Sequence, residues 1–191
     1  MREEHFLKSI FSSPNFSESE FEQIVSKFKK VSFLKNEYLL QEGKTENHYW
    51  FLESGVARSF VNDTHGNDIT TNFYAQGDIV IDWSSFFLRN PTRENIQALT
   101  DCHAWSLDFD SFQYFFNSVE AFREQGRKRL VSSYFALKNQ SVSLIADEAK
   151  ERYLRLLKEK PHLIQNVSLQ HIASYLGITK FSLSRIRKEV S

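Results

Sequence analysis

Short hydroxyl and basic side chains gather near the C-terminal end of this 191-residue chain, outside a helical apolar pattern. Apolar residues at the i, i+3, i+4 and i+7 spacing predict a helix after the N-cap Ser168, and Gly177 can end it. Thr179 can cap a second helix, on which Leu183 and Ile186 face inward. The side chains left outside suit base edges and phosphates. We expect nucleic-acid contacts from Ser168, Thr179, Lys180, Phe181, Ser182, Ser184, Arg185 and Lys188.

The distribution of charge supports this interpretation over the alternative, two amphipathic helices of an ordinary bundle. Residues 150–191 hold nine Lys and Arg against three Glu, although the whole chain has a formal net charge of zero. A basic segment on an acidic body attracts phosphates because released counterions drive association with nucleic acid. The coincidence of this excess charge with the helix-turn-helix pattern predicts double-stranded DNA as a partner.

Other chemistries have little support in the sequence. The single cysteine, Cys102, cannot form an internal disulfide or a multi-cysteine zinc or iron–sulfur site. We predict that it is a small core residue of a cytoplasmic protein. The six histidines lack metal-ligand spacing, so no metal site is predicted, and heme held by one histidine has no support. The pair Ser84-Ser85 has no recognisable base, so we expect no enzyme activity. No apolar run approaches the roughly 20 residues of a membrane span, and we expect no membrane association.

Short strands must form the body of the protein that carries the C-terminal helices. Residues 1–29 predict two short helices separated at 12–15, the second with a capping box of Ser17 and Glu20. From Val31 to Asp108 turn signals separate short apolar runs, which is typical of an antiparallel barrel or jelly roll. We expect strands at 31–34, 38–41, 49–53, 57–61, 69–74, 79–81, 96–99 and 103–107.

One long helix is predicted between this barrel and the C-terminal helices. Residues 119–146 contain no proline and would form a helix about 40 Å long, longer than a small core needs. Leucines recur along it every seven residues, which favours the seam of a two-stranded homodimer. The alternative is that its apolar stripe packs entirely on the barrel. The seam would contain Leu130, Tyr134, Leu137, Ser141 and Leu144.

A hinge or cap at 147–148 leads into an amphipathic helix at 149–159, which Pro161 cannot extend. Its residues Tyr153, Leu154, Leu156 and Leu157 are expected to face a core. The chain therefore divides into a barrel domain at 1–118, a dimerisation helix at 119–146 and a helix-turn-helix domain at 147–191.

A barrel, a long helix and a terminal helix-turn-helix, in this order, resemble the cyclic-AMP receptor protein/FNR family of transcription regulators. The most specific pieces are Gln41-Glu42-Gly43, Tyr49-Trp50-Phe51-Leu52, Ser54-Gly55-Val56, Gln76-Gly77-Asp78 and the run from Ile172 to Arg185. The resemblance implies an α+β fold with an N-terminal β-roll or jelly-roll barrel, flanking helices and a C-terminal helix-turn-helix without a long wing. It also implies a homodimer, a near-palindromic operator and RNA polymerase as a partner. Phe181 departs from the Glu that many members carry, so the operator should not be copied from relatives.

The effector site of the family is matched less well. Members that bind cyclic nucleotides use Gly-Glu for the ribose and Arg-Ser or Arg-Thr for the phosphate. Here Ile81 replaces the glycine, Asp82 is a shorter carboxylate, and Glu94 follows Arg93. We expect cyclic AMP not to be the effector, and another small ligand or none stays open. The predicted effector pocket contains Asp82, Trp83, Ser85, Arg89, Arg93, Ser133 and Leu137.

One other class of function fits the sequence. A ligand-sensing or scaffolding barrel could carry a helical tail that binds a protein partner instead of DNA. Only phosphate contacts release counterions on a large scale, so the salt dependence of binding distinguishes the two.

Overall fold

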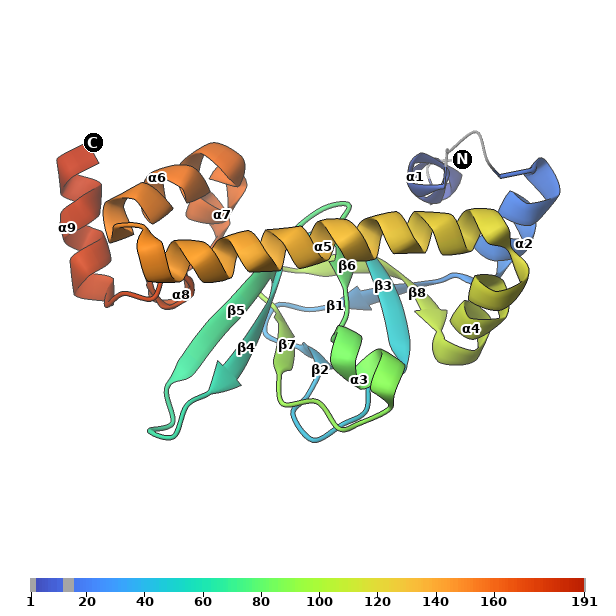
Figure 1. The fold of residues 1–191 in the computed structure, drawn as a ribbon, viewed down its shortest axis with the longest axis horizontal. Coiled ribbons are helices and arrows are strands. Elements are labelled where there is room, and N and C mark those ends of the chain that lie inside the picture. Colours follow the sequence, from blue (N-terminus) through green and yellow to red (C-terminus); the bar gives the residue numbers. More distant parts are fainter. Residues whose placement is uncertain (1–2, 12–15, 191) are drawn as a thin grey trace.

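The computed structural model describes residues 3–11 and 16–190, so the break predicted at 12–15 lies outside the described residues. Helix α5 crosses the whole molecule, with the barrel along its middle (Figure 1). Helices α1, α2 and α4 lie at one end of it and α6 to α9 at the other. The helices are α1 (Glu3–Ile10), α2 (Glu18–Lys27), α3 (Trp83–Leu88), α4 (Phe109–Ser118), α5 (Glu120–Ala146), α6 (Ala149–Glu159), α7 (Pro161–Asn166), α8 (Leu169–Tyr175) and α9 (Lys180–Val190).

All eight predicted strands are confirmed, with ends that differ by one or two residues. They form two antiparallel four-stranded sheets, ordered β1-β8-β3-β6 and β2-β7-β4-β5. The predicted jelly-roll barrel is therefore confirmed. The strands are β1 (Lys29–Phe33), β2 (Tyr38–Leu40), β3 (His48–Ser54), β4 (Ala57–Asn62), β5 (Asp68–Tyr74), β6 (Ile79–Val80), β7 (Asn95–Ala98) and β8 (Cys102–Asp108).

Three buried clusters hold the elements together. Aliphatic and small residues of both sheets, among them Leu52 and the fully buried Cys102, fill the barrel. A second, mostly aromatic cluster joins the barrel to the N-terminal helices and the start of α5, where Phe112 meets Phe122 edge-to-face with 5.5 Å between ring centroids. The third cluster joins the C-terminal helices to the barrel residues Val56, Phe73 and Leu99. The C-terminal helices therefore share a core with the barrel.

The turn between β3 and β4 depends on a glycine. Gly55 has a φ of +96°, and a Cβ atom there would lie 2.5 Å from the carbonyl oxygen of Asp101. Any side chain would therefore clash with the backbone as well as strain the turn.

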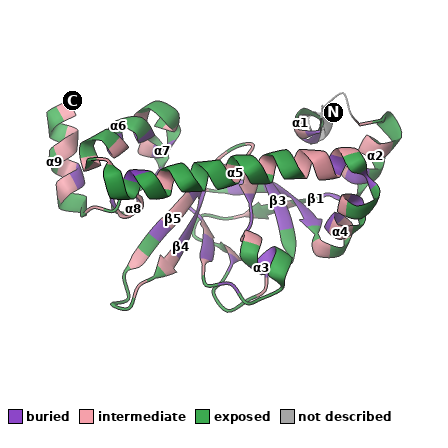
Figure 2. Ribbon diagram, viewed as in Figure 1, coloured by how far each residue is buried: buried purple, intermediate pink, exposed green. Residues whose placement is uncertain are grey.

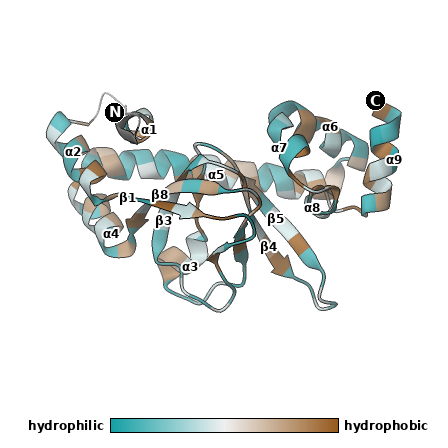
Figure 3. Cartoon of the chain, turned by 180° about the vertical axis from the view of Figure 1, so that it is seen from behind, coloured by the Kyte–Doolittle hydropathy of each residue, from teal (hydrophilic) through white to brown (hydrophobic). Residues whose placement is uncertain are grey.

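The C-terminal helices follow the predicted pattern with two corrections. The predicted cap before α6 is confirmed, because Glu148 and Glu151 form a capping box. Brown and teal segments alternate along α6 (Figure 3), but Leu154 is 44% exposed, so its predicted core position is wrong. Helix α7 was not predicted. Pro161 ends α6 and also begins α7, where the first turn needs no backbone donor.

Candidate functional site

Helices α8 and α9 begin at the caps that the sequence predicts. The hydroxyl of Ser168 accepts a hydrogen bond from the backbone N–H of His171 at 3.3 Å and starts α8. Gly177 ends the turn with a φ of +66°. The hydroxyl of Thr179 accepts from the backbone N–H of Ser182 at 3.1 Å and starts α9. Both helix starts are thus satisfied locally.

Helix α9 presents a basic and aromatic outer face. Lys180, Phe181, Arg185 and Lys188 are exposed, whereas Leu183 on the opposite side is fully buried. The guanidinium of Arg185 lies over the ring of Phe181, 4.6 Å from its centroid. This cation–π contact restricts the arginine fork on the surface and leaves its five N–H donors to solvent or a partner. Ser182 and Ser184 are half-buried beside this face.

Two other arginines of the basic segment hold the head on α5, the head being residues 147–190. Arg152 donates to the carbonyl oxygen of Leu176 at 3.1 Å, and also to the carbonyls of Ser143 and Asp147. Arg155 donates to the Ser143 hydroxyl at 2.8 Å and pairs with the Asp147 carboxylate at 2.6 Å. The hydrogen bond from Arg155 lowers the pKa of Asp147. Arg152 and Arg155 therefore stabilise the connection between α5 and the head.

The middle and the C-terminal part of α5 are largely exposed (Figure 2), and they carry a broad apolar stripe. The stripe does not pack on the barrel of its own chain, so that alternative is wrong. All five predicted seam residues are exposed, but the sequence analysis missed four neighbours. A strict seven-residue count misses them because a straight helix drifts about 20° per heptad. The exposed apolar residues of α5 are Leu130, Val131, Tyr134, Phe135, Leu137, Val142, Leu144 and Ile145.

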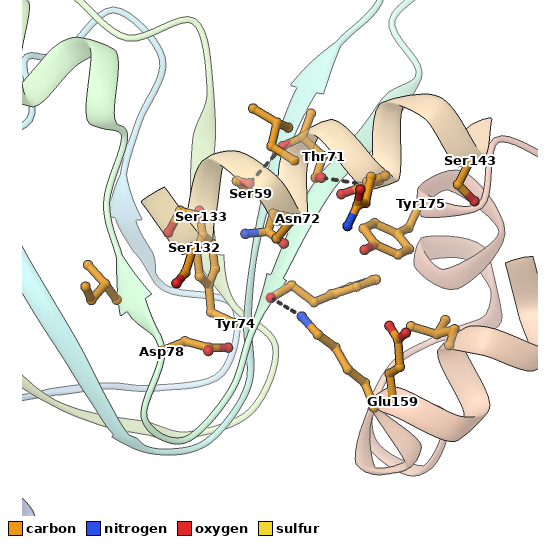
Figure 4. Close-up of a pocket in the computed structure, with 18 of the residues that line it drawn as sticks. Ser59, Thr71, Asn72, Tyr74, Asp78, Ser132, Ser133, Ser143, Glu159 and Tyr175 are labelled. Atoms are coloured by element: carbon orange, nitrogen blue, oxygen red, sulfur yellow. Dashed lines mark hydrogen bonds between the residues drawn. The ribbon is translucent and has the colours of Figure 1, made fainter. Parts of the chain in front are cut away.

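A cavity of about 1390 Å³ lies between the barrel, α5 and the head (Figure 4). Hydroxyl and amide groups of β4, β5 and α5 face it, including Ser59, Asn72 and Ser132, which the sequence analysis missed. Strand alternation and helical periodicity gave no signal for them, because neither separates a polar residue facing a cavity from one facing solvent. Four predicted pocket residues line the cavity and three do not. The four are Asp82, Trp83, Ser133 and Leu137, and the three are Ser85, Arg89 and Arg93.

The three residues outside the cavity have other positions. Ser85 is buried, accepts from the backbone N–H of Glu46 at 2.9 Å and donates to the carbonyl of Asn90 at 2.6 Å. Arg89 has a left-handed backbone with a φ of +57° after α3, and it donates to the carbonyl of Glu46 at 2.6 Å. Arg93 is exposed. The pocket prediction failed for these three because Ser85 and Arg89 bond to backbone groups of the barrel domain itself and Arg93 faces solvent.

The barrel side of the cavity is acidic. The Asp82 carboxylate caps α3 by accepting from the backbone N–H of Ser84 and Ser85, and it accepts from the Thr92 hydroxyl. Burial and the nearby Asp82 carboxylate raise the pKa of Glu94. Of the described barrel residues that line the cavity, none is a lysine or arginine. A cyclic-nucleotide phosphate requires cationic or N–H donors, so the barrel side of the cavity does not fit one. The cationic residues that line the cavity all belong to α5 or the head: Lys128, Arg129, Arg152, Arg155 and Lys160.

Glu46 is a buried acid next to α3, and its backbone bonds to Ser85 and Arg89. Glu46 is 1% exposed, and one of its carboxyl oxygens accepts from the backbone N–H of His48 at 2.9 Å. The other oxygen has no hydrogen-bond partner among the described residues. Burial raises the pKa of Glu46 to about 8. This acid is buried in the fold and does not line the large cavity.

Known proteins match the chain in its barrel segment and in its whole fold. The family model of the cyclic nucleotide-binding domain matches residues 30–119. Among solved structures, FixK2 from Bradyrhizobium japonicum has a TM-score of 0.75 at 18% identity, with 85% of this chain and 84% of FixK2 covered. A CooA variant from Carboxydothermus hydrogenoformans has a TM-score of 0.71 at 19% identity, with 96% and 83% covered. The chain therefore shares the fold of these structures and of a protein assigned to the CRP/FNR family of transcriptional regulators from Eubacterium rectale, which has a TM-score of 0.72 at 12% identity, with 91% of this chain and 83% of that chain covered.

Other comparisons add to this result. The c-di-GMP responsive regulator CLP from Xanthomonas campestris has a TM-score of 0.67 at 15% identity, with 91% of each chain covered. All four structures are less than 20% identical to this chain, so the likeness is one of fold. A search of curated proteins finds no match. In the described part of the chain, no cluster of His, Cys, Asp and Glu could hold a metal, and none of the helices is apolar enough over a sufficient length to cross a membrane.

Proposed function

We propose that this protein is a cytoplasmic, DNA-binding transcription regulator that acts as a homodimer on a near-palindromic operator. The observation that carries the proposal is the exposed face of α9, where Lys180, Arg185 and Lys188 project from a capped helix in the CRP/FNR fold. Arg185 supplies a fork of donors for guanine or phosphate, and Phe181 supplies an apolar contact for a thymine methyl. RNA polymerase is a further partner by family resemblance.

A second copy of the chain is the proposed occupant of the apolar stripe on α5. Ile145 in this stripe is 86% exposed in the single chain, and Tyr134 is 61% exposed. Monomeric proteins rarely expose a continuous apolar surface of this kind. A two-fold pairing of α5 would place both α9 helices in successive major grooves, roughly 34 Å apart.

A small ligand is proposed as the effector, bound in the cavity beside Asp82, Trp83, Ser133 and Leu137. Cyclic nucleotides are disfavoured by the carboxylates of Asp82 and Glu94 on the barrel side. Mass spectrometry of the natively purified protein would detect such a ligand, whose identification would define its chemistry.

The DNA-binding proposal is tested by selecting binding sites from random duplex DNA. We expect a near-palindromic sequence, and an affinity for it that falls steeply with salt, because several phosphates are neutralised. Gel-shift titrations between about 50 and 200 mM salt measure this slope. If no sequence is enriched and binding to nonspecific DNA is negligible, the alternative of a protein-binding helical tail would replace the proposal.

The homodimer is tested by Ile145→Asp. The proposed dimer would bury one Ile145 from each chain, and losing both weakens association by about 3 kcal/mol or more. The variant should therefore be monomeric at micromolar concentration and should lose operator binding. Light scattering after size-exclusion chromatography measures the mass. Asn139→Asp, on the same helix but outside the stripe, is the control. A dimeric Ile145→Asp variant would contradict the proposed seam.

A further inference from the structure

Strand β5 is an edge strand whose outer side meets the head. Its sheet is ordered β2-β7-β4-β5, so one side of β5 pairs with β4, and the other side pairs with no strand of the described residues. The register shifts between Ser59 and Phe60 of β4, which leaves Thr71 of β5 as an extra residue. A bulge of this kind changes which backbone groups face outward. An uncovered edge of this kind would offer unsatisfied N–H and C=O groups.

Three helices satisfy these backbone groups with polar side chains. The Ser174 hydroxyl, on α8, accepts from the Thr70 N–H at 2.8 Å and donates to the Asp68 carbonyl at 3.3 Å. Gln140 of α5 donates to the carbonyl of Thr71, and Lys160, which ends α6, donates to the carbonyl of Phe73, both at 3.4 Å. Figure 4 shows this side of β5 facing α5 and the head. We call these bonds from Ser174, Gln140 and Lys160 the edge contact.

Apolar and charged groups reinforce the edge contact. The rings of Phe73 and Tyr175 lie 5.0 Å apart, and both belong to the core that the barrel shares with the head. The Asp68 carboxylate binds the buried Arg58 at 2.6 Å and faces His171 of α8 at 3.8 Å. The head is therefore held by a specific set of bonds to the barrel in addition to its covalent connection through α5.

We propose that the edge contact sets the orientation of the recognition helix α9 relative to the barrel, with Ser174 and Lys160 as positioning residues for DNA binding. The proposal rests on the proposed function. Helix α8 carries the bond to β5 and packs against α9 in the same core, so a fixed α8 fixes α9. Because the bonds end on backbone atoms of β5, any shift of this strand moves the head with it. In a dimer, two heads fixed in this way read a single half-site spacing.

The double variant Ser174→Ala with Lys160→Met tests the proposal without touching the outer face of α9. Inserting one base pair between half-sites should weaken binding of the wild type about tenfold or more, because it rotates and shifts one half-site. The loosened heads of the double variant should tolerate the insertion with a loss of about threefold or less. Gel-shift titration on the selected site and the lengthened site gives this ratio. Lys158→Met, two residues before Lys160 and exposed on α6, is the matched control for the lysine substitution.

Amide hydrogen exchange tests the contact itself and needs no DNA. The Thr70 N–H should exchange faster in Ser174→Ala than in the wild type, while amides of β4 should be unchanged. Unchanged exchange at Thr70 would overturn the contact, and an unchanged spacing tolerance in a folded double variant would overturn its positioning role. Failure of the wild type to select any DNA would instead overturn the proposed function, and the positioning role with it, whatever the exchange result.

Discussion

Two arginines predicted to contact ligands have different roles in the head and in the barrel. Arg185 lies over Phe181 and makes no hydrogen bond or ion pair with the described residues. Arg89 lies over Phe109, 4.0 Å from the ring centroid, but its guanidinium donates to the carbonyl of Glu46 and to the side chain of Asn47. The first is available to a partner, and the second is part of the fold.

The difference follows from what surrounds each polar group. On an amphipathic helix such as α9, whose outer face no other described element covers, a polar residue off the apolar face meets solvent, so periodicity identifies it. In a small barrel, polar residues lie beside buried backbone groups that need partners, so the fold uses many of them. The sequence does not distinguish these structural polar residues from ligand-binding ones, and Ser85, Arg89 and Asp82 all bond to the protein itself.

The largest expected effect concerns a polar group that is buried in the barrel. Burial raises the pKa of Glu46 to about 8, so the folded protein binds this proton more tightly than the unfolded chain. The resulting stability is fully present below a pH of about 4.5 and is lost as pH rises through about 8. Glu46→Gln should remove this loss. The variant should match the wild type at low pH and exceed its free energy of unfolding at high pH by an amount on the order of a few kcal/mol.

Urea denaturation at a series of pH values measures this dependence, with Glu42→Gln as the exposed control from the same loop. A pH dependence of stability that is identical in wild type and Glu46→Gln would show that the acid is not buried as described. It would also weaken the contrast between the barrel and the head.

A matched pair of substitutions tests the contrast between the two arginines. Arg185→Ala should weaken operator binding by about 1–3 kcal/mol and change the free energy of unfolding by less than about 0.5 kcal/mol, because the side chain is exposed. Arg89→Met should do the reverse, with a stability loss of about 1–2 kcal/mol and little change in DNA affinity. Gel-shift titration and thermal unfolding of both variants give the two quantities. An equal effect of both variants on DNA affinity would remove the distinction.

The sequence predicted the fold well because its signals are local. Turn residues mark every strand of the barrel, and caps mark both helices of the helix-turn-helix. The contacts that could not be predicted from the sequence depend on tertiary structure. Nothing near Ser174 or Gln140 in the sequence indicates that they bond to the edge of β5, which lies 104 and 69 residues away, respectively. The lining of the cavity by Ser59 and Ser132 likewise depends on how α5 crosses the barrel.

The smallest expected effect concerns Thr179 of the head. This residue is the one for which a structural role and a DNA-binding role are hardest to separate. Thr179 was predicted both as a cap and as a DNA contact, and its hydroxyl already accepts from the backbone N–H of Ser182. Thr179→Ala should therefore destabilise the head by about 1 kcal/mol, or about 2–4 °C in the unfolding midpoint, and Thr179→Ser should restore it. Calorimetry of the three proteins measures the midpoint, and gel shift measures the affinity. If Thr179→Ala leaves the midpoint unchanged but weakens DNA binding, the hydroxyl contacts the DNA and does not stabilise the helix. Thr179 would then differ from Asp82 of the barrel, whose side chain caps helix α3.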